Sequence, residues 1–142
     1  MGTAAEIFEL CFPVAPADID SMGHVNNVTY VRWVQDAAVA HWRSATSEEE
    51  RQKWLWVVIR HEIDYKASAV LGDEIVVKTR VGTARGLKFQ RHTDIFRASD
   101  GTLLVQALSI WCPVDSATKR PGLVTDDIRR RFSIPEELQD SL

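Results

Sequence analysis

A change in hydrophobic period partway along the chain is the sequence feature that most limits how it can fold. From Val28 to Trp42, apolar residues recur at spacings of three and four, which indicates one face of a helix over about residues 27–43. From Leu55 the period becomes two, and strand-like alternation continues to Cys112. A helix with one apolar stripe and a sheet with one apolar face each need the other as a partner. The sequence therefore predicts an α+β domain with a long helix packed on a curved antiparallel sheet.

Turn and cap signals divide the rest of the chain into elements. Ser47 and the three Glu residues after it have the pattern of a helix start, and Thr125 caps a short helix that ends near Phe132. In the first alternating run, Leu55 and Ile63 are expected on the same face. The last four strands are expected to form a meander. The expected strands cover residues 7–14, 55–65, 74–81, 87–96 and 102–112. A five-stranded open sheet leaves an edge, which predicts pairing with a second copy.

Composition excludes several classes of function. The 142 residues, 45% of them hydrophobic, suit one compact domain over residues 1–142. A net charge of −3 does not favour nucleic-acid binding, and no apolar run reaches the roughly 18–20 residues that a membrane span needs. The N-terminus lacks a signal peptide's pattern, and two scattered cysteines suit neither a disulfide framework nor a metal site. We therefore expect a cytoplasmic protein with no nucleic-acid partner, no membrane partner and no metal.

The segment DIDSMGHVNNVTY, residues 18–30, crowds polar side chains at the mouth of the long helix. The first N–H groups of a helix lack intrahelical partners and carry partial positive charge. In one interpretation Asn26 or Asn27 only caps the helix. In the other, the free N–H groups near Asn27 form an oxyanion hole, Gly23 allows close approach, and a nearby carboxylate acts as nucleophile or general base. The second interpretation predicts acyl transfer or hydrolysis.

The same segment resembles the signature D-x-D-x-x-G-H-V-N-N-x-x-Y of hotdog-fold thioesterases, the 4-hydroxybenzoyl-CoA thioesterase-like family. The residues Asp64-Tyr65-Lys66, followed by Gly72-Asp73-Glu74, also resemble this family's junction between its second and third strands. The resemblance implies a hotdog fold, in which a long central helix is wrapped by a curved five-stranded antiparallel sheet. It further implies an acyl-CoA thioesterase that needs no cofactor and works as a homodimer or homotetramer.

The resemblance also assigns roles to individual residues. Asp20 matches the family's catalytic carboxylate, the N–H near Asn27 matches its oxyanion donor, and His24 helps to position the substrate carbonyl or the water. Asp18 is expected to shape the loop, and Asp36 on the helix is an alternative acid. Substrate contacts are expected from the loop and from the basic hairpin that would meet the CoA phosphates, namely at Gly23, Asn26, Tyr30, Arg85 and Lys88.

Some features keep other functions open. Plant acyl-carrier-protein thioesterases place an Asn where Met22 stands and a Glu or Cys where Ala67-Ser68 stands. An acyl-carrier-protein thioesterase is one alternative, and a non-catalytic acyl-CoA binding protein is another. Simple solvation explains the charges of Arg85 and Lys88 nearly as well as a CoA contact. Aromatic, short and long acyl groups are all compatible with the sequence, and Trp54-Leu55-Trp56 is expected to line the acyl pocket.

Overall fold

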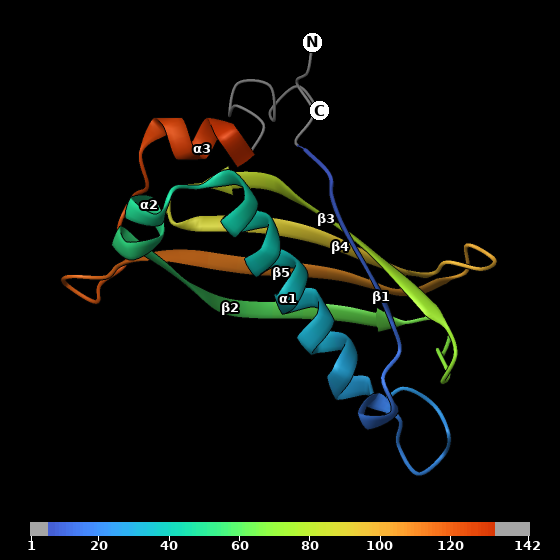
Figure 1. Ribbon diagram of the computed structural model, residues 1–142. Coiled ribbons are helices and arrows are strands. Elements are labelled where there is room, and N and C mark those ends of the chain that lie inside the picture. Colours follow the sequence, from blue (N-terminus) through green and yellow to red (C-terminus); the bar gives the residue numbers. More distant parts are fainter. Residues whose placement is uncertain (1–5, 133–142) are drawn as a thin grey trace.

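The computed structural model describes residues 6–132 and shows one long helix crossing one face of a five-stranded sheet (Figure 1). The helices predicted at residues 27–43, after Ser47 and after Thr125 are confirmed, as are all five strands. The elements in chain order are β1 (Phe8–Pro13), the short 3-10 helix η1 (Pro16–Asp18), α1 (Asn27–Ala45), α2 (Glu48–Lys53), β2 (Trp54–Tyr65), β3 (Glu74–Arg85), β4 (Lys88–Arg97), β5 (Leu103–Asp115) and α3 (Asp126–Phe132).

The sheet is antiparallel throughout, with the strand order β1-β3-β4-β5-β2. The predicted meander is right for β3, β4 and β5, which tight turns connect, but wrong for β2. That strand pairs with β5, so that Tyr65 lies opposite Val105, and it forms an edge of the sheet. The connection over residues 66–73 is too long for a tight hairpin, and it lets the chain cross from one edge strand to the other side of the sheet.

The buried stripe of α1 only partly matches the face that its sequence indicates, since Val34 and Ala38 are buried as expected. Tyr30, Trp33, Val34 and Ala37 are buried against the sheet, whereas Val28 is 73% exposed. Within the first turn of α1, Val28 therefore faces outward while Thr29 and Tyr30 are already buried. The apolar spacing identified the helix correctly, but the face that is buried is rotated slightly about the helix axis from the predicted face.

A β-bulge changes which residues of β2 face α1. Trp54 and Trp56 point towards the core at the start of the strand, and the register shifts between Val58 and Arg60. After the shift His61 and Ile63 take the inward positions. Leu55 and Ile63 therefore do not share a face, because a bulge adds one residue and inverts the alternation. The outward face keeps three half-exposed apolar side chains, Leu55, Val57 and Ile59.

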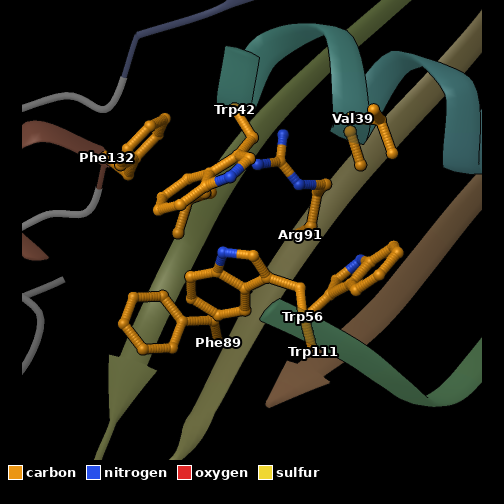
Figure 2. Close-up of a pocket in the computed structure, with 9 residues that line it drawn as sticks. Val39, Trp42, Trp56, Phe89, Arg91, Trp111 and Phe132 are labelled. Carbon is orange, nitrogen blue, oxygen red and sulfur yellow. The ribbon is translucent and has the colours of Figure 1, made fainter. Parts of the chain in front are cut away.

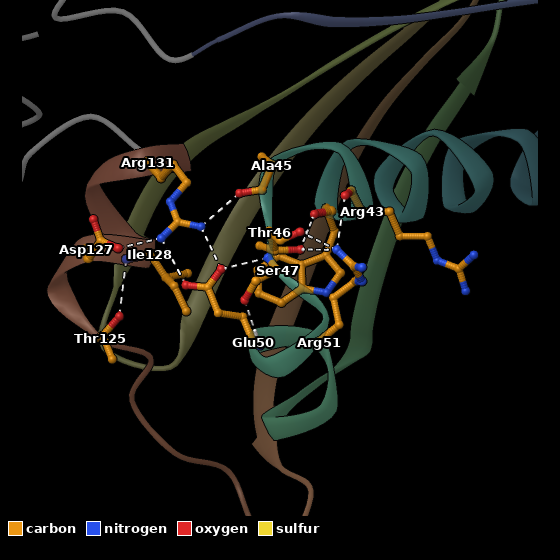
Figure 3. A network of polar contacts seen from close by, with 11 residues as sticks. Arg43, Ala45, Thr46, Ser47, Glu50, Arg51, Thr125, Asp127, Ile128 and Arg131 are labelled. Carbon is orange, nitrogen blue, oxygen red and sulfur yellow. Dashed lines mark hydrogen bonds and ion pairs between the residues drawn. The ribbon is translucent and has the colours of Figure 1, made fainter.

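A group of charged side chains holds α2 and α3 at the C-terminal end of α1 (Figure 3). Arg131 of α3 donates from Nη1 and Nη2 to the two carboxylate oxygens of Glu50, at 2.9 and 3.0 Å, and from Nη1 to the carbonyl oxygen of Ala45 at 2.8 Å. Ser47 and Glu50 form a reciprocal capping box at the start of α2. The Arg131 hydrogen bond, with the Ser47 N–H, lowers the pKa of Glu50 to about 2. This end of the molecule is therefore built from contacts between residues far apart in sequence.

Candidate active site

The loop before α1 is a tight hairpin that holds Asp20 beside the helix start. Ile19 and Val25 form an antiparallel bridge, and the Asp20 N–H donates to the carbonyl oxygen of His24 at 2.8 Å. The Gly23 N–H closes the turn by donating to the Asp20 carbonyl at 3.1 Å. Gly23 has φ = 81°, which side chains disfavour, and the space around its missing Cβ is open. Gly23 is therefore required by the turn rather than by close packing.

One of the two carboxylate oxygens of Asp20 accepts hydrogen bonds from its own loop. Its Oδ1 accepts hydrogen bonds from the backbone N–H groups of Met22, at 2.9 Å, and His24, at 3.3 Å. Its Oδ2 has no hydrogen-bond partner among residues 6–132. The loop thus fixes the orientation of the carboxylate through one oxygen and leaves the other able to accept a proton or attack a carbonyl.

The start of α1 offers one free backbone donor next to this hairpin. Asn26 is the N-cap, and its Oδ1 accepts from the Val28 N–H at 2.9 Å. The Asn27 N–H has no acceptor within the described part of the chain. Of the two capping candidates, Asn26 is therefore the cap, and capping leaves the Asn27 donor unused. Tyr65 of β2 donates its hydroxyl to the Asn27 carbonyl oxygen at 3.3 Å, which ties the helix start to the sheet.

An ion pair between the buried Asp18 and the exposed Arg32 supports the hairpin. Asp18 is 4% exposed, and its two carboxylate oxygens accept from Arg32 Nη2 and from the Ala15 N–H, both at 2.9 Å. The carbonyl oxygen of Asp18 accepts from the Asn26 N–H at 2.9 Å. Asp18 therefore shapes the loop, as expected. Asp36 is exposed and lies 3.9 Å from Arg32 Nε, on the solvent side of α1.

His24 and Tyr30 differ in exposure: His24 faces solvent, and Tyr30 is buried beneath the loop. His24 is exposed, and its ring makes no hydrogen bond to any described residue. Tyr30 is 2% exposed, and its hydroxyl oxygen accepts from the Ala69 N–H at 2.9 Å. Burial raises the pKa of Tyr30. Tyr30 thus belongs to the core beneath the loop, where its hydroxyl holds the backbone at Ala69. A substrate contact is expected at Tyr30 from the family resemblance, and its buried position is different from that expectation.

The basic hairpin is at the far end of the sheet from Asp20. Arg85 and Lys88 face each other across the β3–β4 turn and are both exposed. The other end of β3, at Glu74, pairs with Pro13, just before η1 and the Asp20 hairpin. A twelve-residue strand spans about 36–40 Å, so one chain does not bring the two groups together. Figure 1 shows this hairpin below α3 and the Asp20 loop at the opposite end of α1.

Two supporting residues were missed by the sequence reasoning. Arg32 and Asp18 are 14 residues apart, and Tyr65 and Asn27 are 38 apart, so no helical or strand spacing links them. The two missed residues are Arg32 and Tyr65. Tyr65 had one signal in the sequence, its place in the strand junction that resembles the family's, and Arg32 had none. Within residues 6–132, no three His, Cys, Asp or Glu side chains form a cluster that could hold a metal ion. None of the described helices combines the length and hydropathy of a membrane span.

Comparisons with known proteins place the chain in a family. A family profile described as the thioesterase-like superfamily matches residues 14–142. A curated relative, the chloroplastic palmitoyl-acyl carrier protein thioesterase of Gossypium hirsutum, is 23% identical over 132 residues, which are 87% of this chain and 32% of that protein. A second, the chloroplastic acyl-[acyl-carrier-protein] hydrolase of Cuphea viscosissima, is 22% identical over 89% of this chain and 33% of its own length. The chain thus spans about a third of these relatives.

Solved structures share the fold at low sequence identity. The 1,4-dihydroxy-2-naphthoyl-CoA thioesterase from Synechocystis has a TM-score of 0.77 at 18% identity, covering 89% of this chain and 95% of its own. A thioesterase from Thermus thermophilus, complexed with coenzyme A and Zn, has a TM-score of 0.77 at 22% identity and covers 94% of both chains. The long helix on a curved five-stranded sheet is therefore the hotdog fold of thioesterases.

Proposed function

The chain belongs to the thioesterase-like superfamily, and we propose that it hydrolyses an acyl-CoA thioester to a free carboxylic acid and CoA. One observation carries the proposal: within the described residues, a carboxylate with a free oxygen lies in the hairpin that leads directly into a helix start with a free N–H. A thiolate leaves readily, so such a site needs neither a catalytic triad nor a metal to break a thioester.

In this mechanism the substrate carbonyl oxygen lies against the Asn27 N–H. The positive end of the α1 dipole and that N–H stabilise the negative charge that develops on the oxygen. Asp20 either attacks the carbonyl carbon or removes a proton from the water that does so. When water attacks, a C–O bond forms, the C–S bond breaks, and the CoA thiolate takes up the proton that Asp20 removed from the water. When Asp20 attacks, the thiolate leaves a mixed anhydride on Asp20; a water then hydrolyses this anhydride to release the carboxylic acid and supplies the proton. His24, exposed on the same hairpin, positions the carbonyl or the water.

A second copy would complete the CoA site. The β2 edge carries Leu55, Val57 and Ile59 with 42–53% of their surface exposed, which suits burial between two edge strands. Two copies paired antiparallel along β2 run in opposite directions. The partner's basic hairpin at residues 85–88 would then lie at the same end of the joined sheet as the Asp20 loop. We therefore propose a homodimer in which CoA phosphates meet the other copy.

An acyl-carrier-protein substrate is the second candidate, because the curated relatives carry that name. Two features favour CoA. The positions where the resemblance expects the carrier-protein enzymes' Glu or Cys hold Ala67 and Ser68 here, and the superfamily's fold also occurs in the CoA-bound Thermus thermophilus thioesterase. Turnover of one acyl group supplied on CoA and on carrier protein separates the candidates. A higher kcat/KM for the carrier-linked ester would favour the second.

The decisive experiment removes a single N–H. Proline is well tolerated at the first residue of a helix, and Asn26 already has the extended ψ of 138° that suits a residue before proline. Asn27→Pro therefore deletes the oxyanion donor and keeps the helix, while Asn27→Ala deletes only the exposed side chain. Thiol release is measured over benzoyl-, short-, medium- and long-chain acyl-CoA esters.

We expect Asn27→Pro to lose about 10²–10³-fold in kcat on the ester that the wild type hydrolyses best. Asn27→Ala should stay within about threefold of the wild type. Circular dichroism and thermal melts verify that both variants are folded. Equal activity of a folded Asn27→Pro variant would exclude this oxyanion hole, and an inactive wild type on every ester would exclude the proposed function.

A further inference from the structure

A cavity of about 60 Å³ lies between the C-terminal half of α1 and the sheet, away from the Asp20 hairpin (Figure 2). Trp42, on its α1 side, is 15 residues from Asn27, which corresponds to about 22 Å along the helix. Val39, which is 46% exposed, lines the cavity as well and marks where it reaches the surface. Its walls are largely aromatic and come from Trp42, Trp56, Phe89, Trp111 and Phe132.

One wall residue carries a charge. Arg91 of β4 is only 7% exposed, and its Nη1 donates to His41 Nδ1 at 3.0 Å and to Thr79 Oγ1 at 3.1 Å. Its Nε and Nη2 have no acceptor among residues 6–132. Burial lowers the pKa of Arg91 to about 10, so the guanidinium remains a cation at neutral pH.

No carboxylate of the described residues touches Arg91. The nearest acidic group in its network is the exposed Glu6, whose Oε1 lies 3.0 Å from His41 Nε2. Burial and the charge of Arg91 lower the pKa of His41, which favours the neutral ring. Neutral His41 accepts from Arg91 at Nδ1 and donates to Glu6 at Nε2. Among residues 6–132, the charge of Arg91 is therefore compensated only through the His41 ring.

Two further donors at this cavity are unpaired. The indole Nε1 atoms of Trp56 and Trp111 are buried and have no hydrogen-bond partner within the described residues. Figure 2 shows the Trp56 nitrogen on the edge of its ring that faces Trp42. Burying a donor without a partner costs free energy, so native proteins rarely leave two in one place. Together with the Nε and Nη2 of Arg91 they make a group of donors that have no acceptor within residues 6–132.

We propose that this cavity binds a carboxylate group carried on an apolar stem. The free Nε–Nη2 edge of Arg91 is the side of a guanidinium that grips a carboxylate with two parallel hydrogen bonds. The cavity has room for about four to six water-sized groups, which matches a carboxylate and the first methylene behind it. The aromatic walls suit the stem, which leaves past Val39. A plain alkyl end would leave the Arg91 donors unpaired, and a cation would be repelled.

The carboxylate has two possible sources. It is either a free carboxylic acid or the far end of an acyl group whose other end is the thioester; the second source rests on the proposed function. In an antiparallel β2 pair, each cavity lies towards the end of the joined sheet that carries the other copy's Asp20. The cavity's preference for a carboxylate is independent of this arrangement.

The first test measures binding by tryptophan fluorescence, since three of the lining residues are Trp. Hexanoate and its uncharged isostere hexanamide are titrated into the wild-type protein at pH 7. We expect saturable quenching with at least tenfold tighter binding of hexanoate. Arg91→Met should lose that tenfold preference and keep its affinity for hexanamide. Arg43→Met, which removes an exposed arginine of α1, is the matched control and should behave as the wild type.

Equal affinity of the wild type for hexanoate and hexanamide would overturn the proposal, and so would an unchanged preference in folded Arg91→Met. The comparison of the two ligands on the wild type needs no variant, so it stands if Arg91→Met fails to fold. Arg91→Lys, which keeps the cation but loses the two-donor edge, should show a preference between those of wild type and Arg91→Met.

The second test identifies the source by comparing hydrolysis of adipoyl-CoA and hexanoyl-CoA, which differ only by the far carboxylate. A higher kcat/KM for adipoyl-CoA that reverses in Arg91→Met assigns the carboxylate to the substrate. Equal kcat/KM values, with hexanoate still bound, assign it to a free acid. If neither these esters nor any other acyl-CoA is hydrolysed, the proposed function fails, while the fluorescence titration still decides what the cavity binds.

Discussion

The two ends of α1 treat their unpaired hydrogen-bond donors in opposite ways. At the N-terminal end the Asn27 N–H is exposed, so water satisfies it at little cost until a substrate oxygen replaces the water. At the C-terminal end the unpaired Nε and Nη2 belong to Arg91, a residue only 7% exposed, and two buried indole N–H groups lie beside it in the walls of the aromatic cavity. An exposed donor suits a charge that appears briefly, whereas buried donors suit a ligand that stays bound.

The same contrast holds for the contacts that build each end. The Asp20 carboxylate is oriented by hydrogen bonds from residues two and four positions away, Met22 and His24. The C-terminal end depends on partners such as Glu50 and Arg131, which are 81 residues apart. Changes at the first end should therefore affect activity more than stability, and changes at the second should do the reverse.

The largest effect is expected at the N-terminal end, from Asp20→Asn. Asparagine keeps an oxygen that can accept from the Met22 and His24 N–H groups, so the hairpin should retain its shape. It is neither a nucleophile nor a base, and kcat/KM on the best acyl-CoA ester should fall at least about a hundredfold. The thermal midpoint should move by less than about 2 °C. A folded variant with wild-type turnover would remove Asp20 from the mechanism.

A smaller effect on stability is expected at the C-terminal end, from Glu50→Gln. Loss of the charged pair with Arg131 should lower the free energy of unfolding by about 1–2 kcal/mol at pH 7, as measured by urea titration. Glu49→Gln, an exposed neighbour in the same turn, is the control and should change stability by less than about 0.5 kcal/mol. Turnover should be unchanged in both variants, and a large loss of activity in Glu50→Gln would contradict the division between the two ends.

The pH dependence of this effect has a defined sign. The pKa of Glu50 is about 2 in the folded protein and near 4.5 without its partners. A lowered pKa in the folded state stabilises the protein above the unfolded value and loses that contribution as pH falls towards the folded value. The difference in stability between wild type and Glu50→Gln should thus be constant above about pH 5 and shrink steadily down to pH 2. A difference that grows on acidification would contradict the assigned charge state.

The smallest effect is expected from Asn26→Ala, which removes the side-chain cap of α1. Loss of the hydrogen bond to the Val28 N–H should cost about 1 kcal/mol of unfolding free energy. Asn27→Ala is the matched neighbour, and its exposed side chain should contribute almost nothing. Equal costs for the two changes would mean that the cap is not confined to Asn26.

Much of the fold and of the candidate site could be predicted from the sequence. The period change at Leu55 identified the helix and the strands, and the residues 18–30 contained the carboxylate, the turn glycine and the cap. The position of β2 beside β5 could not be predicted, since pairing between strands of similar pattern depends on the path of a connecting loop. The bulge after Val58 could not be predicted either. It is defined by the register of β2 against β5, which the sequence of β2 alone does not show.

The sequence by itself determined what short-range physics controls: the helix, a cap at Asn26 or Asn27, and a polar loop that holds Gly23 and Asp20 close together in the chain. Each of these depends on residues within a few positions of one another. Only the tertiary structure decided that Arg91, a β4 strand residue, is enclosed with the indoles of Trp56 and Trp111. Those residues come from separate strands, and whether their donors find partners depends on how the whole sheet packs against α1. Burial, unlike helix spacing or turn chemistry, is a property of the assembled molecule.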